Sequence, residues 1–340
     1  MAVKALTAGA ACLALLLLQA PFARGQSITT EAALSAGSST DDVQAGAVQL
    51  RAFGELKNGV RFFGEAAWAA SSDTGNDAFG AAYPYLNNVQ VIEAYGERIF
   101  RPSDAVLDIR AGRFRTPFGI YNASDHAYMG FLRSPLVRYL AYESSLSNNF
   151  LEHGADVVVG VPRLTFETAL GAPADVGKAT RASGLDTLFR VQGSYGPFIV
   201  GVSHLQNHAS GTPEYSSGSS SFSATATGID VRWMQSGVQL RGEWISGKPT
   251  EDATNNGWYV DALIHRVGMG PVTAVARIEQ LSVTDEGEDT DQGRQTIGSR
   301  VRVLEGLSLN VDVVHRSGEF PTKFHGTALD LGITWTLRHQ

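Results

Sequence analysis

Cysteine, lysine and long hydrophobic runs are scarce in this sequence. Cys12 is the only cysteine among 340 residues, and only 5 of the 27 basic residues are lysine. A small secreted fold held together by disulfides is therefore excluded. The formal net charge is −7, which argues against nucleic acid as a partner because phosphates bind basic surfaces. Beyond residue 18, no run approaches the length of about 20 apolar residues that a transmembrane helix needs.

The first residues have the pattern of a cleavable secretory signal. Lys4 is followed by an apolar run over residues 5–18, and small residues flank Arg24 shortly before Gln26. A charged start, an apolar centre and a small-residue exit are typical of an export signal, and the run is too short to span a bilayer. We therefore predict a signal peptide at residues 1–25 and an exported domain at residues 26–340.

From residue 27 onward, apolar and polar residues alternate. Val48 and Leu50 alternate with Gln49 and Arg51, and the same alternation returns after an Asn-Gly pair. A period of two residues predicts strands with one apolar face, and Asn-Gly between two such runs predicts a tight hairpin. The pattern predicts sixteen strands, at residues 27–37, 44–56, 60–70, 89–100, 105–115, 152–161, 164–171, 185–195, 198–206, 222–234, 238–246, 258–267, 272–282, 295–303, 307–316 and 326–338.

The connections between these strands fall into two kinds. Seven tight turns alternate with eight longer polar connections, near residues 38–43, 71–88, 116–151, 172–184, 207–221, 247–257, 283–294 and 317–325. Short turns on one side and long loops on the other are typical of outer-membrane barrels. A sheet that spans a membrane has to close, because every backbone group must be paired. We therefore expect an all-β fold, a transmembrane antiparallel up-and-down β-barrel of about sixteen strands. An exported soluble β-protein is the weaker alternative.

The connection at residues 116–151 is unusually long and rich in aromatic side chains. Loops beyond about 12–15 residues are uncommon unless they have a function, and this composition is wrong for a solvated, disordered segment. We expect this loop, which follows the fifth strand, to fold inward onto the barrel wall and to narrow the pore. The residues expected at the constriction are Asp125, His126, Arg133, Arg138 and Glu143.

The passage into this loop carries a local motif. Residues 110–121 read Arg-Ala-Gly-Arg-Phe-Arg-Thr-Pro-Phe-Gly-Ile-Tyr, which is similar to the strand-to-loop passage of the phosphate-selective porin O and P-like family. With sixteen strands, a signal peptide and a long loop after the fifth strand, the chain resembles the bacterial outer-membrane porins. The resemblance implies a trimeric passive channel in the outer membrane of a Gram-negative type of cell, with its long loop folded inward.

We therefore predict a passive diffusion channel for small hydrophilic solutes or ions, with no reaction, no cofactor and no bound metal. Two other functions stay open, a barrel that serves as an adhesin or structural anchor and an outer-membrane hydrolase. No catalytic residue is assigned. Charges on the polar faces of the strands are expected to stay solvated and to line the pore: Arg51, Arg61, Arg110, Arg190, Arg232, Arg241, Arg277, Arg300, Arg302, Glu55, Glu65, Asp108, Glu167, Asp230, Glu243, Asp261 and Glu279.

The outward side chains of the early strands are smaller than those of the late strands. Ala52, Gly64 and Ala66 are small, and small residues suit close contact between subunits whereas large ones suit lipid. We therefore expect a homotrimer that buries the early strands. Arg113 and Arg115 fall in the outward phase of the fifth strand, where an interface would tolerate them better than hydrocarbon.

The expected surroundings of the barrel are the lipid bilayer and lipopolysaccharide. The acidic run at residues 285–291 could bind divalent cations that bridge lipopolysaccharide. It lacks the spacing of a calcium loop, so a solvated external loop is the favoured interpretation.

Overall fold

The computed structural model describes residues 27–56, 58–72, 89–120, 131–138, 151–173, 184–210, 221–248, 253–265, 270–285, 287–319 and 326–339. The predicted signal peptide and two stretches of the long loop, 121–130 and 139–150, lie outside the described residues. Within the described ranges, no helix is both long and apolar enough to cross a bilayer.

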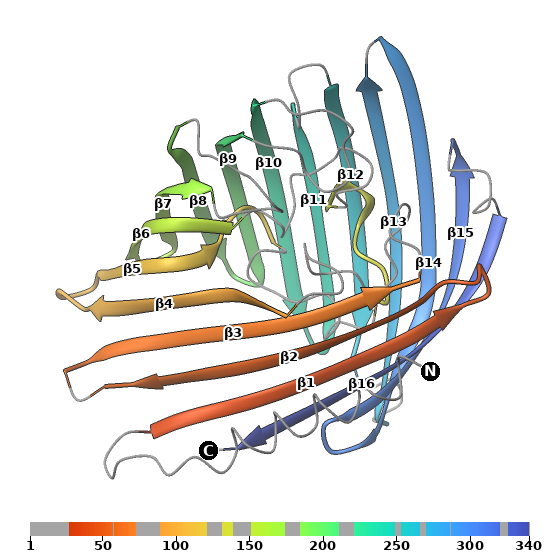
Figure 1. Ribbon diagram of the computed structural model, residues 1–340, viewed down its shortest axis with the longest axis horizontal. Helices are drawn as coiled ribbons and strands as arrows, with labels where there is room; N and C mark the ends of the chain where they lie inside the picture. The colour runs from red at the N-terminus through yellow and green to blue at the C-terminus, as the bar shows by residue number, and fades with distance from the viewer. Residues whose placement is uncertain are drawn as a thin grey trace.

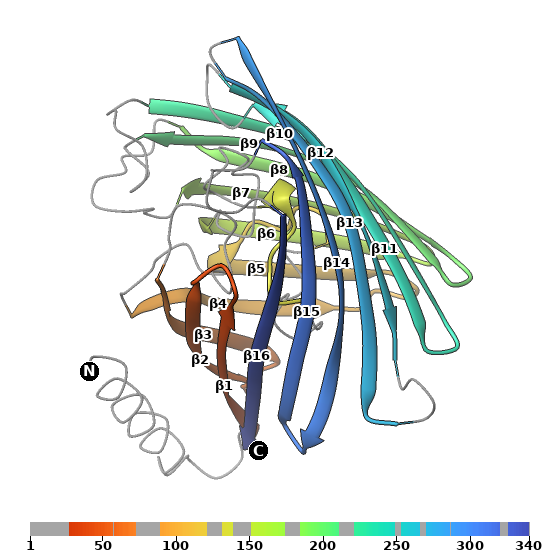
Figure 2. The ribbon, with the colours of Figure 1, turned by 90° about the vertical axis from the view of Figure 1, so that its right-hand side faces the viewer.

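Sixteen antiparallel strands form one closed sheet, in which each strand pairs with its neighbours in the sequence and β1 pairs with β16. Figures 1 and 2 show the barrel from two sides, with β1–β5 on one wall and β10–β14 on the other. The expected all-β antiparallel barrel is confirmed. Its strands are β1 (Ser27–Ser39), β2 (Gln44–Glu55), β3 (Val60–Ser71), β4 (Gln90–Phe100), β5 (Val106–Arg115), β6 (Leu151–Val161), β7 (Leu164–Pro173), β8 (Asp186–Tyr195), β9 (Phe198–Ser210), β10 (Ser221–Gln235), β11 (Val238–Lys248), β12 (Ala253–Ile264), β13 (Val272–Asp285), β14 (Glu288–Leu304), β15 (Leu307–Gly318) and β16 (Gly326–His339).

The largest errors in the predicted strand boundaries are at β12 and β14. β12 covers Ala253–Ile264 instead of 258–267. β14 starts at Glu288 instead of residue 295, so most of the predicted connection at residues 283–294 is strand. In both places polar residues continue the alternating pattern, and a solvated loop and a polar strand end have the same composition.

The acidic run therefore lies in a tight hairpin between β13 and β14 and does not form a long loop. Asp285 pairs with Glu288 in register, and Gly287 between them takes a φ of 86°, a left-handed conformation that glycine adopts without strain. The Thr284 hydroxyl donates to Asp289 Oδ1 at 2.6 Å, and this hydrogen bond gives one carboxylate of the acidic run a partner on the neighbouring strand.

The two faces of the barrel wall differ sharply in polarity. Along β12, Val260 is 44% exposed whereas its neighbour Asp261 is 0% exposed. The same contrast repeats around the barrel, with large apolar side chains exposed outside and charged side chains inside. This polarity is the reverse of that of a soluble barrel, and it suits an outer surface in contact with lipid.

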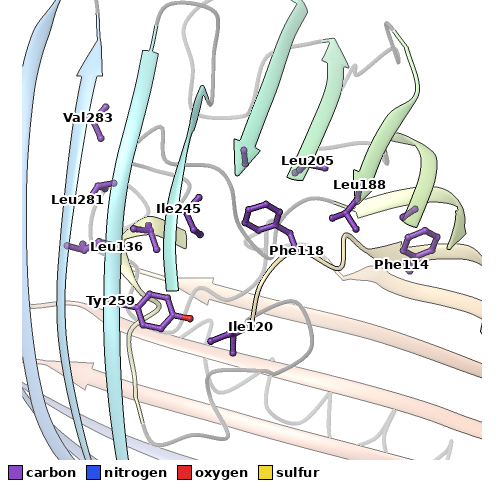
Figure 3. Close-up of a cluster of buried hydrophobic side chains, with 13 residues drawn as sticks. Phe114, Phe118, Ile120, Leu136, Leu188, Leu205, Ile245, Tyr259, Leu281 and Val283 are labelled. Atoms are coloured by element: carbon purple, nitrogen blue, oxygen red, sulfur yellow. The ribbon is translucent and has the colours of Figure 1, made fainter. Parts of the chain in front are cut away.

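The long loop after β5 folds into the barrel wherever the structure describes it, at residues 116–120 and 131–138. The second stretch ends in a 3-10 turn, η3 (Leu136–Arg138). Phe118, Ile120 and Leu136 are buried in one cluster with inward-facing side chains of β8–β13, as Figure 3 shows. The expectation of an inward-folding loop is met in these two stretches.

The chain leaves the wall at a local turn directly after Arg115. The Phe118 N–H donates to the Thr116 carbonyl at 2.8 Å, and Gly119 takes a φ of 66°. Pro117 has no N–H to give to the ladder, so the strand cannot continue through it. These residues turn the chain toward the barrel interior.

Candidate functional site

The charged residues predicted to line a pore all lie on strands, in the phase that faces the barrel interior. The structure divides them into two groups. One group lies on the inner face of β8–β13 and is buried: Arg190, Asp230, Arg241, Glu243, Asp261, Arg277 and Glu279. Glu65 on β3 is also buried, whereas the other residues of the set keep contact with solvent, most of all Glu55 and Arg61 beside the tight turn between β2 and β3, whose side chains are 53% and 42% exposed.

The buried group is held by ion pairs between adjacent strands. Asp261 on β12 lies between two guanidinium groups, at 2.7 Å from Arg241 Nη2 and 2.6 Å from Arg277 Nε. Glu279 accepts from Arg294 Nε at 2.7 Å. All five side chains are at most 3% exposed, so each charge depends on its partner rather than on water.

Several of these wall charges also bind the backbone of the loop. The N–H of Leu136 donates to Glu279 Oε2 at 2.6 Å, and the N–H of Ile120 donates to Glu243 Oε1 at 3.3 Å. Arg277 Nη1 donates to the Arg133 carbonyl at 2.8 Å. A loop inside a barrel has no ladder for its own N–H and C=O groups. The wall supplies these partners, so part of the charged wall anchors the loop.

Arg133 is the described member of the predicted constriction set, and it does not face an open pore. Its guanidinium donates to both carboxylate oxygens of Asp330 on β16, at 2.5 and 2.8 Å, and lies 3.6 Å from Asp41. Arg133 is only 2% exposed. The expectation that it faces the pore is wrong, because two aspartates bind it to the wall. Outside the described residues lie Asp125, His126, Glu143 and the side chain of Arg138.

Inward-facing glycines receive the apolar side chains of the loop. A Cβ atom added at Gly257 would come within 2.3 Å of Val137, and one added at Gly332 would come within 2.4 Å of Leu132. Gly228 approaches the Phe118 ring in the same way, at 2.8 Å. The wall therefore has hollows that match the loop, and no sequence pattern had marked these glycines.

The wall formed by β1–β5 carries a second set of paired charges. Arg51 on β2 lies 2.7 Å from Glu65 on β3 and 3.3 Å from Glu31 on β1. Arg115 joins the same group, at 2.8 Å from Glu65. The prediction that Arg115 points outward is wrong, because the chain turns inward at the end of β5. Arg51 and Glu31 remain 18% exposed, so this wall keeps contact with the lumen.

The expectation that inner charges stay solvated is therefore met on only part of the wall. The described loop stretches cover the inner face of β8–β16, whereas the charged side chains of β1–β5 are largely half-buried or exposed. Glu31, Glu93, Glu97 and Arg294 belong to the inner wall and are absent from the predicted set. Their place in the alternation of β1, β4 and β14 is the signal that could have identified them.

Inward side chains on β8–β16, under the loop, and those on β1–β5 are expected to differ in their accessibility to chemical reagents. Cysteine introduced by Glu55→Cys is expected to react with a membrane-impermeant thiol reagent, whereas cysteine introduced by Arg241→Cys is expected to stay protected under the loop. Ile278→Cys, on the outer face, serves as the lipid-facing control. Cys12 is the only cysteine of the sequence and lies in the predicted signal peptide, so each variant reports on a single thiol once residues 1–25 are removed. Equal labelling of positions 55 and 241 would contradict this division of the wall.

Comparisons with known proteins identify the fold. The barrel is similar to OprB of Pseudomonas putida, with a TM-score of 0.64 at 11% identity, covering 92% of this chain and 94% of that one. It is similar to the anion-selective porin of Comamonas acidovorans, with a TM-score of 0.61 at 10% identity over 92% and 99% of the two chains. OmpT of Vibrio cholerae in its trimer form matches with a TM-score of 0.55 at 10% identity over 92% and 99%.

At the level of sequence there is no match, either to a family model or to a curated protein. The chain thus has the fold of the sixteen-stranded outer-membrane porins, and identities of 10–11% show the fold alone.

Proposed function

We propose that this protein is a passive outer-membrane channel for small hydrophilic solutes or ions. The observation that carries the proposal is the partial exposure of inward-facing charges on β1–β5, where Arg51 and Arg110, away from the strand ends, remain 18% exposed inside a closed barrel. A barrel of sixteen strands is too wide for its own side chains to fill. The described stretches of the loop lie on the β8–β16 side, and the water-filled path of the proposed channel runs along the early strands.

The proposed selectivity arises from charges of both signs that line the pore. Arg232, Arg300 and Arg302 lie on the inner phase of β10 and β14. On the side of β2–β7 the acidic residues stand beside arginines, with Glu55 at 3.4 Å from Arg61 and Glu167 at 3.9 Å from Arg110. A charged lining of this kind favours polar solutes over apolar ones of the same size.

The proposal includes export and assembly as a homotrimer. Among the described strands, the exposed large apolar side chains all lie beyond β3, and the outer face of β2 and β3 interleaves small residues such as Ala52 and Gly64 with half-buried large ones such as Trp68. A surface of this kind suits contact with a second copy better than contact with lipid. The residues proposed as the signal peptide are 1–25, and the lipid bilayer with lipopolysaccharide would surround the trimer.

Single-channel recording in planar bilayers tests the proposal. The purified protein is expected to insert and to conduct in steps, and a trimer is expected to produce steps in groups of three equal sizes. Protein that folds in detergent and inserts into the bilayer but does not conduct would contradict the proposed channel function. That result would favour the function of an anchor or adhesin. Conduction in single steps would retain the channel and contradict the trimer.

A further inference from the structure

Loop residues 131–133 contact two parts of the barrel that are far apart in the sequence. The Leu132 N–H donates to Asp312 Oδ2 on β15 at 2.9 Å, and the Leu132 side chain fills the hollow at Gly332 on β16. The same side chain packs against Val43, in the connection between β1 and β2. The loop is therefore held here by a connection as well as by the wall.

Arg133 contacts the same two parts of the barrel through its charge. On the wall, its guanidinium donates to both carboxylate oxygens of Asp330, at 2.5 and 2.8 Å. Toward the connection, Arg133 Nη2 donates to Ser39 Oγ at 3.1 Å and lies 3.6 Å from Asp41 Oδ2. The same Asp41 oxygen lies 2.8 Å from Arg316 Nη2 on β15. Because the two arginine side chains are at most 2% exposed, their charges depend on these carboxylates more than on water.

Residues 39–43, which we call the strap, cross beside the start of β16, as Figure 2 shows. The Thr40 N–H donates to the Leu329 carbonyl at 3.0 Å, and the Leu329 N–H donates to Thr40 Oγ1 at 3.0 Å. Asp42 takes a φ of 62°, a left-handed conformation that aspartate adopts more readily than most residues. Thr40 and Asp42 are exposed, whereas the side chain of Asp41 between them is only 12% exposed. The strap thus presents two residues to solvent and one carboxylate to the loop.

The strap differs from the other partners of the loop in how its own position is fixed. Glu243 and Glu279 bind the loop from β11 and β13, whose backbones are paired with a strand on each side. Residues 40–43 lie beyond the ladder between β1 and β2, in which the last pair is Ser38 with Gln44. The strap can therefore change its conformation without breaking the pairing of these two strands.

The strap also lies at the outer end of the proposed channel. It follows β1 and the long loop follows β5, so in an up-and-down barrel both leave the sheet at the same end. The long connections of an outer-membrane barrel face the outside of the cell. A macromolecule that binds Thr40 or Asp42 from outside would therefore contact the segment whose Asp41 holds Arg133.

We propose that the strap couples the outer surface of the barrel to the pore by holding loop residues 131–133 on the wall. The inference rests on the proposed channel function and adds a regulation to it. Asp41 is a positioning residue, because it acts on the conducting path through Arg133 and not by contact with a solute. When the strap is displaced, Arg133 loses a carboxylate partner, and the loop segment populates a second position with a different pore width.

Single-channel recordings of two matched variants test the role of Asp41. Asp41→Asn and Asp42→Asn each remove one carboxylate from the strap, so they change the charge at the mouth of the channel equally. Asp41→Asn is expected to show transitions to a second current level about tenfold more often than the wild type, because it weakens a nearly buried ion pair. Asp42→Asn is expected to match the wild type. Asp41→Glu keeps the carboxylate and is expected to restore most of the wild-type behaviour.

Two further measurements identify the moving part and its link to the outside. In the Asp41→Asn background, Val43→Cys and Leu132→Cys place two thiols in a packed contact. Their oxidation is expected to suppress the additional transitions, and a reducing agent is expected to restore them. In an otherwise wild-type channel, Asp42→Cys is labelled with biotin, and streptavidin bound to this label is expected to raise the frequency of transitions. The unlabelled Asp42→Cys channel with streptavidin is the control.

The possible outcomes separate the regulation from the channel. Equal transition frequencies in conducting Asp41→Asn and wild-type channels, or in the Asp41→Asn and Asp42→Asn variants, would overturn the role of Asp41 and retain the channel. Transitions that persist after oxidation of the cysteine pair would show that loop residues 131–133 are not the moving part. A streptavidin-bound channel that behaves like the unlabelled control would overturn the coupling to the outer surface. Absence of any conductance in the wild type would overturn the proposed function itself.

Discussion

Excision of residues 122–145 is expected to raise the single-channel conductance about twofold or more, since the free cross-section of a water-filled barrel sets its conductance. The excised part includes the segment 131–138, which covers the inner wall from β12 to β16. Without it, Arg277 and Arg294, which donate to the carbonyls of Arg133 and Ser134, would face the lumen and add solvated charge to the pore. The measurement is ion current through single channels in planar bilayers, with larger neutral solutes as a second probe of pore width.

A folded deletion variant is required for this comparison. Resistance of the barrel to detergent at room temperature reports folding independently of conductance. Arg133→Ala is the matched point variant: it keeps the length of the loop and removes its ion pairs with Asp330 and Asp41. It is expected to raise conductance less than the excision does. Unchanged conductance in a folded deletion variant would mean that the loop does not limit the pore.

The largest loss of stability from a single substitution is expected for Asp261→Ala. The carboxylate lies between Arg241 and Arg277, and all three side chains are at most 3% exposed. Its removal leaves two buried guanidinium groups facing each other, and breaking a buried ion pair from one side costs about 3–5 kcal/mol. The measurement is the urea concentration at the midpoint of unfolding in detergent. The folded fraction is read from the electrophoretic mobility, which differs between heated and unheated samples of a folded barrel.

Two variants make this stability prediction specific. Glu55→Ala also removes an inward carboxylate, but the side chain is 53% exposed, so the expected change is within about 1 kcal/mol. The triple variant Arg241→Met/Asp261→Leu/Arg277→Met replaces the whole network by apolar side chains, and it is expected to recover most of the loss. Equal unfolding midpoints for Asp261→Ala and Glu55→Ala would show that the buried network does not support the barrel.

The strand pattern is a property that the sequence expresses locally. A strand whose two sides meet lipid and the barrel interior must alternate apolar and polar residues, so each run of the predicted set carries its own signal. The predicted and observed bounds of β5, 105–115 and Val106–Arg115, differ by one residue. The signal fails where both faces are polar, as at the start of β14, where Glu288–Asp291 has the composition of a loop.

The inward course of the loop could also be inferred, because a connection so rich in aromatic and apolar residues cannot remain in water without cost. The hydrogen bonds and ion pairs that hold the loop on the wall could not be inferred from the sequence. Arg133 binds Asp330, which lies 197 positions later, and Leu136 binds Glu279, 143 positions later. No period or local motif records which wall residue meets which loop residue, since these contacts arise only when the sheet closes.

By itself, the sequence determined the barrel, its number of strands, the face that most strand residues present and the existence of an inward loop. These follow from alternation and from the requirement that every backbone group be paired. Only the tertiary structure decided which inner charges are covered and which remain in the lumen. Burial of an inward residue depends on what lies across the barrel from it. Residues of the same type and phase, such as Arg61 and Arg241, therefore differ in solvation because the described stretches of the loop dock on the wall that carries Arg241.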